Sequence, residues 1–183
     1  MSSYSFVAGA LAGAFSISAF MKLVQPQSFR LFLESLVAQK PTKRLLAVGT
    51  PIIELGIACS LLTPSAGAGA IAAGVLSMAS AAVAIAATRR PQSPGCGCFG
   101  SLDAVTPHSL TLIRALGFLT AAAYCIVVAR GLAAPTLEPS LVAIGAVAGI
   151  AIATSMSLLG QIVQFRVILR RLVLEPTSAA EVR

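Results

Sequence analysis

The uncharged run SLVAIGAVAGIAIATSMSLLG, residues 140–160, decides the class of fold to which this chain belongs. A helix rises about 1.5 Å per residue, so a run of this length crosses the roughly 30 Å hydrocarbon core of a bilayer. Backbone polar groups in lipid must pair within their own segment, so such a run is predicted to be a helix. Together with four similar apolar runs it gives five predicted spans, near residues 4–24, 45–63, 67–88, 109–129 and 140–163.

The composition agrees with a membrane protein and excludes an ordinary soluble domain. Hydrophobic residues make up 57% of the 183 residues, charged residues 10%, and the mean hydropathy is +0.91. A soluble domain carries roughly 25% charged residues. We therefore predict one transmembrane domain over residues 1–183, an all-α integral membrane bundle with a lipid bilayer around it. The net charge of +7 does not indicate a nucleic-acid partner, because basic residues in a membrane protein report mainly on topology.

The basic residues predict the orientation of the chain. Cytoplasmic loops are enriched in Lys and Arg, and eleven of the thirteen basic residues fall on one side of the predicted spans. This places the N-terminus outside and the loop 89–108 and the basic tail 164–183 in the cytoplasm, in a multi-pass protein of the cell membrane. The eleven basic residues on that side are Lys22, Arg30, Lys40, Lys43, Arg44, Arg89, Arg90, Arg166, Arg170, Arg171 and Arg183.

The opening MSSYS has no basic region before the first apolar run, so we expect the first span not to be a removable signal peptide.

Two further patterns concern helix packing. Apolar residues recur at helical spacing over residues 28–38, which predicts a short helix at the membrane interface with its apolar face in the lipid. Glycines four residues apart occur at Gly9 and Gly13 and again at Gly145 and Gly149. Small residues at this spacing allow helix backbones to approach closely in lipid, which predicts packing inside the bundle and leaves contact between two copies as the alternative.

Two cysteines stand one glycine apart in RRPQSPGCGCFGS, residues 89–101. Cysteines this close can bring their Cα atoms within the bridgeable distance of about 4.4–6.8 Å, and a disulfide in so small a ring is strained and labile. The two arginines that open the segment and a predicted helix start that follows it favour the thiolate form. We predict that Cys96 and Cys98 are a catalytic redox pair. Two unreactive cysteines in a turn are the alternative.

A metal site is a competing interpretation of the same segment. Cys96, Cys98 and His108 offer two sulfur ligands and one imidazole, which suits Cu(I), Zn or a heavy metal. A closed structural zinc site needs four ligands, and the chain contains only one histidine. We therefore predict no metal site, and keep these three residues as the alternative.

Two ionisable residues lie inside predicted spans. Glu54 is in PIIELG on the second span and Arg114 is in LTLIRAL on the fourth. A charge in the bilayer core is costly and marks either an ion pair or a functional site. Counted from the cytoplasmic ends, the two residues differ in depth by roughly 6 Å, which long side chains can bridge. We predict a polar pocket that Glu54 and Arg114 share, either as a structural ion pair or as a site for a charged or quinone-like ligand or for a proton.

The other two cysteines, Cys59 and Cys125, lie at similar predicted depths in the second and fourth spans. This match permits a second dithiol on the outer side of the membrane. Cysteine is also a small apolar residue that fills space in a core, which is the alternative.

The string GCGCFGS, followed by a helix that contains Arg114, resembles the methylamine utilisation protein MauE family within the DoxX-like membrane proteins. Lys22 at the end of the first span and Glu54 in PIIELGIACSLL also match. The resemblance covers about residues 6–130, a four-span core, and the fifth span lies beyond it. It implies a role in thiol redox chemistry, in methylamine metabolism and in the maturation of disulfide-containing clients, with Cys96 and Cys98 as the redox pair and a thioredoxin-like protein as partner.

The sequence thus favours a membrane thiol–disulfide redox component, an oxidoreductase if it is an enzyme. Quinone is the one cofactor that we consider, as an exchange partner for Cys96 and Cys98. Because the client is exported while the charge pattern places this pair inside, a relay to Cys59 and Cys125 would be needed. The alternatives are a carrier or sensor of soft metal ions and a non-catalytic subunit of a membrane complex.

Overall fold

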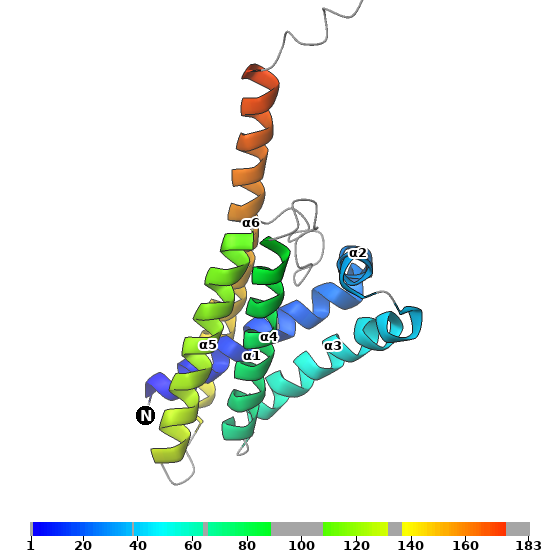
Figure 1. Cartoon of the computed structure of the whole chain (residues 1–183). Helices are drawn as coiled ribbons and strands as arrows, with labels where there is room; N and C mark the ends of the chain where they lie inside the picture. Colours follow the sequence, from blue (N-terminus) through cyan, green and yellow to red (C-terminus); the bar gives the residue numbers. More distant parts are fainter. Residues whose placement is uncertain (1, 38, 64–65, 89–107, 132–136, 175–183) are drawn as a thin grey trace, which may run out of the picture.

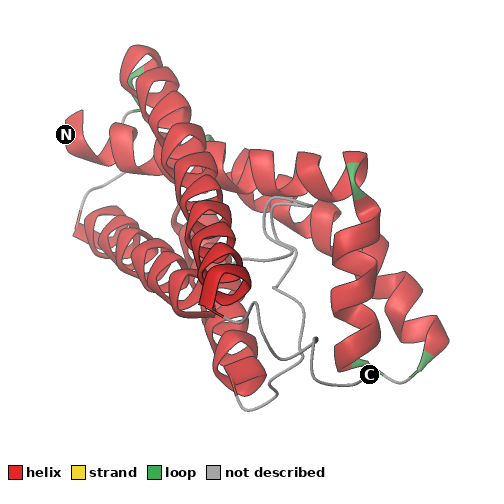
Figure 2. Ribbon diagram, turned by 90° about the horizontal axis from the view of Figure 1, so that it is seen from above, coloured by secondary structure: helices red, strands yellow, loops and turns green. Residues whose placement is uncertain are grey.

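The computed structural model describes residues 2–37, 39–63, 66–88, 108–131 and 137–174, and all of its regular elements are helices. Figure 2 shows that the described part of the chain is helical throughout and contains no strand. Five of the helices are long and apolar enough to cross a membrane, which confirms the predicted all-α membrane bundle. The six helices are α1 (Ser2–Val24), α2 (Pro26–Leu36), α3 (Lys40–Leu61), α4 (Ala66–Thr88), α5 (His108–Gly131) and α6 (Pro139–Leu174).

Helix α1 forms the centre of the bundle. Of its apolar span, 56% is buried inside the protein, against 22–33% for the other four spans. It contacts every other helix, and its longest contact is with α6. In Figure 1, α1 and α3 run obliquely while α4, α5 and α6 stand nearly upright. A central helix that crosses its neighbours obliquely can touch different partners along its length.

The N-terminal half of α1 packs on α6 through glycines. A Cβ atom added at Gly9, Gly13, Gly145 or Gly149 would collide with the backbone of the facing helix. Only glycine allows so close an approach. This confirms the prediction that the two glycine pairs pack inside the bundle. The facing residues are Val142 for Gly9, Ala146 for Gly13, Phe6 for Gly145 and Ala10 for Gly149.

Helices α4 and α5 form the second extensive contact of the bundle. They share an apolar core with α1 and α3, in which small alanines alternate with larger side chains. Phe15 on α1 and Phe118 on α5 meet in this core, with ring centroids 5.8 Å apart. Because α4 ends and α5 begins on the same side of the bundle (Figure 1), the connection 89–107 starts and returns at one membrane face. The largest buried members of the core include Tyr4, Leu11, Phe15, Ile57, Leu61 and Cys125.

The short helix α2 differs from its prediction in one respect. The sequence pattern predicts an apolar face in the lipid, but Phe29, Phe32 and Leu33 are buried in the protein. They pack against Ala47 of α3 and Val83 of α4. The first part of α3 and the last part of α4 thus offer a protein surface that the hydropathy pattern alone does not reveal.

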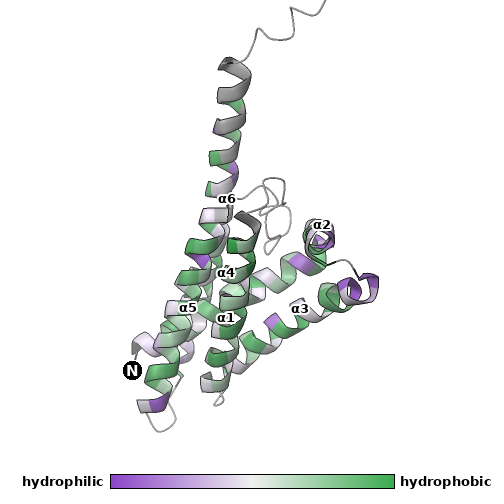
Figure 3. Ribbon diagram, in the orientation of Figure 1, coloured by the Kyte–Doolittle hydropathy of each residue, from purple (hydrophilic) through white to green (hydrophobic). Residues whose placement is uncertain are grey.

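Two helices extend beyond the predicted apolar spans. Helix α3 begins at Lys40, with a proline in its first turn, where the missing N–H group costs no hydrogen bond. Helix α6 continues to Leu174, eleven residues past the apolar window that ends at Val163, which corresponds to a length of about 16 Å. Figure 3 shows the hydrophilic residues gathered at α2 and the beginning of α3, while the long helices are mostly apolar.

Candidate functional site: a buried polar cluster in the bundle

An ion pair joins α1 and α3 inside the bundle. The Lys22 Nζ atom lies 2.5 Å from Glu54 Oε1, and the two side chains are only 1% and 6% exposed. Ser18 lies four residues before Lys22 on the same face of α1. Its hydroxyl accepts a hydrogen bond of 2.8 Å from Lys22 and donates one of 3.1 Å to the same Glu54 oxygen. These three residues form a closed network.

Helix α2 covers this network on the side of the membrane surface. The Phe29 ring lies under the Lys22 ammonium group, with the nitrogen 5.3 Å from the ring centroid. The negative face of an aromatic ring attracts a cation at this distance. Lys22 is therefore held from three directions, by a carboxylate, a hydroxyl and a ring.

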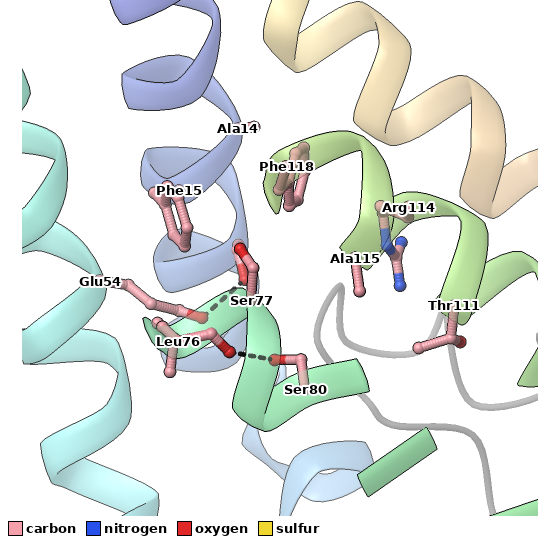
Figure 4. A pocket seen from close by; sticks show the side chains of 11 residues that line it. Ala14, Phe15, Glu54, Leu76, Ser77, Ser80, Thr111, Arg114, Ala115 and Phe118 are labelled. Atoms are coloured by element: carbon pink, nitrogen blue, oxygen red, sulfur yellow. Dashed lines mark hydrogen bonds between the residues drawn. The ribbon is translucent and has the colours of Figure 1, made fainter. Parts of the chain in front are cut away.

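A cavity of about 40 Å³ adjoins Glu54. Figure 4 shows the Glu54 side chain reaching from α3 toward the space between α1 and α4, with Arg114 and Thr111 on the other side. Four helices contribute to its wall. Its polar lining residues are Ser18, Glu54, Ser77, Ser80, Thr111 and Arg114.

The cavity lies close to the membrane face at which residues 89–107 are attached. Thr111 and Arg114 are three and six residues from the start of α5, and Ser80 is eight residues from the end of α4. At 1.5 Å per residue these positions are roughly 4 to 12 Å below the two helix ends. These residues are thus about one to two helical turns from the end of α4 and the start of α5.

Arg114 connects this cluster to α6. Its Nη1 atom donates a hydrogen bond of 3.2 Å to Ser157 Oγ, and both residues are buried. Arg114 also lies in the wall of a second cavity, of about 290 Å³, between α1, α5 and α6. The rest of that wall is apolar, with Ile113, Phe118 and Ile152 among its members.

The structure brings Glu54 and Arg114 to the same cavity, but the ion pair of Glu54 is with Lys22. Sequence reasoning missed this partner because it compared depths as if the helices were parallel. The oblique path of α1 brings the end of the first span to the middle of the second (Figure 1). The sequence offered one signal for this partner, because Lys22 is a basic residue at the end of an apolar span. The hydroxyls of Ser18, Ser77, Ser80 and Thr111 gave no such signal.

The structure does not bring Cys59 and Cys125 together. Both are free thiols; Cys59 is exposed on α3 and Cys125 is fully buried on α5. No Cα atom of α3 lies within 8 Å of a Cα atom of α5, whereas a disulfide needs roughly 4.4–6.8 Å. Cys125 is part of the apolar core, as expected for a residue that fills space.

Cys96 and Cys98 lie outside the residues that the structure describes, and so does the side chain of His108 at the start of α5. Among the described side chains, no group of three His, Cys, Asp or Glu residues is arranged to hold a metal ion. The predicted redox pair and the metal alternative therefore remain predictions.

Fold and site together define a multi-pass membrane bundle with a buried charged cluster in its core. Residues 2–128 match the family model of methylamine utilisation protein MauE, and the chain belongs to this family. The match includes Lys22, Glu54 and Arg114 and ends within α5, so α6 lies beyond it. Searches among curated proteins and solved structures find no match.

Proposed function

We propose that this MauE-type membrane protein is a thiol–disulfide redox component that uses Cys96 and Cys98. The main support is the placement of the buried polar cluster, roughly 4 to 12 Å beneath the helix ends that carry the Cys-Gly-Cys segment. Charged groups are expensive in a bilayer and are usually functional. In this proposal, Glu54 and Arg114 shape a polar pocket near the helix ends to which the Cys-Gly-Cys segment is attached.

The proposed chemistry is an exchange of two electrons and two protons. When Cys96 and Cys98 form a disulfide, their two thiols lose two hydrogens, and the disulfide of a thioredoxin-like partner gains them as two thiols. The reverse reaction reduces the pair. The strained ring of a Cys-Gly-Cys disulfide makes the oxidised form an easy target for a thiolate. Repeated exchange of this kind supports the maturation of disulfide-containing client proteins.

Quinone is the second class of exchange partner. The cavity between α1, α5 and α6 supports it, because an apolar wall with one arginine suits a lipid-soluble ring that carries oxygen acceptors. A quinone would accept the same two electrons and two protons. Quinone as a partner predicts that Met156→Trp, which fills this cavity, slows oxidation of the dithiol by added quinone and leaves exchange with a thioredoxin-like protein unchanged.

The proposed orientation places Cys96 and Cys98 on the cytoplasmic side of the cell membrane. It is supported by the basic residues of α2, the start of α3 and the end of α6. A client outside the membrane then requires electrons to cross, and Cys59 and Cys125 are candidates for that relay. Since they lie on helices that do not touch, the relay needs a rearrangement of α3 and α5. Client oxidation that is unchanged in the double variant Cys59→Ser, Cys125→Ser would exclude it.

Differential alkylation tests both the redox activity and the side of the membrane. Cells are treated with a membrane-impermeant maleimide before and after lysis, with and without reductant. We expect Cys96 and Cys98 to react only after lysis and only when reduced. In a Cys98→Ser variant, Cys96 should form a mixed disulfide with a thioredoxin-like protein. Ser155→Ala, at an exposed position of α6, is the control, and it should leave both results unchanged. Labelling that ignores reductant, or the absence of any mixed disulfide, would contradict the proposed function.

A further inference from the structure

We propose that Glu54 is a proton-exchanging carboxylate inside the membrane, served by water molecules in the adjoining cavity and held in place by Lys22. This inference rests on the described residues alone and does not depend on the chemistry of Cys96 and Cys98. It assigns a ligand, water, to the cavity and a function, proton exchange, to the carboxylate.

The two oxygens of Glu54 differ in their surroundings. Oε1 accepts hydrogen bonds from Lys22 and from Ser18. Oε2 is buried and has no hydrogen-bond partner among the described residues, although the residue is only 5% exposed. A buried carboxylate oxygen without a donor is costly, by about 1–3 kcal/mol or more. A donor that the described residues do not supply is therefore expected at Oε2.

The cavity beside Glu54 has the size and lining for that donor. A water molecule needs at least about 10–15 Å³ of such volume and two to four polar partners, so the cavity of about 40 Å³ holds roughly two or three. The hydroxyls of Ser77 and Ser80 donate to the carbonyls of Ala73 and Leu76 on their own helix. Their protons are thereby used, and their lone pairs remain to accept from water. Water can then donate to Oε2 and to a serine at once.

The charges around Glu54 exclude a metal cation as the ligand. On α1, the Lys22 ammonium group occupies the cation position at Oε1. On α5, Arg114 faces the same cavity, and α4 contributes only uncharged residues to its lining. On α2, the Phe29 ring covers Lys22, and α6 reaches the cluster through Ser157 on Arg114. A further cation would meet two positive side chains, whereas neutral water meets no repulsion.

The proton transfer is a single balanced step. A water molecule in the cavity gives a proton to Oε2 while it accepts one from a neighbouring water, so the cavity itself holds only neutral water. The proton comes from a hydronium ion outside the cavity, which becomes water, and the product is a carboxylic acid. Lys22 keeps its charge and its contact with Ser18. The acid form no longer neutralises Lys22. Protonation therefore weakens the ion pair that joins α1 and α3.

Infrared difference spectroscopy of the purified protein in lipid tests this directly. The chain has only six carboxyl side chains, and Glu54 is the one that is buried among those described. The other carboxyls also protonate at low pH, so the readout is the difference between the wild type and Glu54→Gln. We expect the wild type to show an additional protonated carboxyl band that grows as the pH is lowered, shifts in heavy water and is missing in Glu54→Gln. Glu34→Gln, on the exposed side of α2, is the matched control and should keep the band. A band that survives Glu54→Gln, or no band in the wild type, would overturn the proposal.

A second variant keeps Glu54 and removes the water. Ser77→Val places methyl groups in the cavity and deletes a water partner, so hydrogen–deuterium exchange of the Glu54 carboxyl should be slower than in the wild type. Exchange at the wild-type rate would contradict the role of water. Both measurements are repeated in the Cys96→Ser, Cys98→Ser background. An unchanged band there, together with absent thiol exchange in the parent protein, would disprove the thiol function and leave the proton site intact.

Discussion

The two halves of α1 are held by opposite kinds of interaction. Near the N-terminus, Gly9 and Gly13 bring the backbone of α1 against α6 with no polar side chain between them. Near the C-terminus, Lys22 binds Glu54 of α3 and lies over Phe29 of α2. The first contact depends on shape and tolerates almost no added atom, whereas the second depends on charge and tolerates no missing partner.

This difference separates the part of α1 that stabilises the bundle from the part that is expected to carry function. Shape alone is sufficient to assemble helices in lipid, as the contact between α1 and α6 demonstrates. A lysine and a glutamate buried together are not needed for that purpose, because apolar residues of similar volume pack as well or better. The charged half of α1 is therefore the half that we expect to take part in chemistry. The glycine half holds α1 in position against α6.

The largest effect is expected when the ion pair is broken. Glu54→Ala leaves Lys22 buried without its counter-charge and should lower the free energy of unfolding by about 3–5 kcal/mol. The double variant Lys22→Met, Glu54→Leu should recover most of this loss, because it removes both charges. Unfolding in lipid bicelles measures the difference. Glu34→Ala, on the exposed side of α2, is the control. If Glu54→Ala and Glu34→Ala lower the free energy of unfolding equally, the charged half of α1 does not depend on the ion pair.

An added side chain in the glycine contact should have the next largest effect. Gly149→Val pushes α6 away from the backbone of Ala10 and should cost about 1–3 kcal/mol of unfolding free energy. Gly117→Val is the matched control, because a Cβ atom at Gly117 meets nothing within 4 Å. If both variants unfold alike, the close approach of α1 and α6 does not contribute to stability.

The contact between Lys22 and Phe29 sharpens the comparison within the charged half. Phe29→Leu keeps an apolar side chain but removes the ring under Lys22, which should cost about 1 kcal/mol, since the lysine is desolvated. Phe32→Leu also disrupts the ring pair of α2, whose centroids are 6.3 Å apart, without touching the cation–π contact. Thermal unfolding of the two variants should differ, and equal midpoints would argue against a contribution from Lys22.

The smallest effect is expected at the polar link between α5 and α6. Ser157→Ala removes one acceptor of Arg114 and should cost about 0.6 kcal/mol, the average for hydrogen bonds between membrane helices. Ser155→Ala, at an exposed position of the same helix, should cost nothing measurable. A loss several times larger at Ser157 would mean that charge, and not shape, also holds α6.

The sequence alone predicts the spans well, because length and hydropathy are properties of a single segment. It also predicts that the glycine pairs lie at a close contact between helices, since small residues four apart allow helix backbones to approach in lipid. It does not predict that Lys22 pairs with Glu54, because that depends on the oblique path of α1, which depth along the chain does not encode. The same limit applies to Phe29 and Phe32, whose apolar face could meet lipid or protein until the positions of Ala47 and Val83 were known.

The contact between Ala10 and Gly149 also bears on how the chain is made. About 140 residues separate these two positions, so at roughly 5–20 residues per second the ribosome needs on the order of 10 s to deliver the second after the first. During that interval α1 is already in the bilayer without its principal neighbour. Helix α6 therefore completes the packing of α1, and this contact can form only after all the other spans have been synthesised.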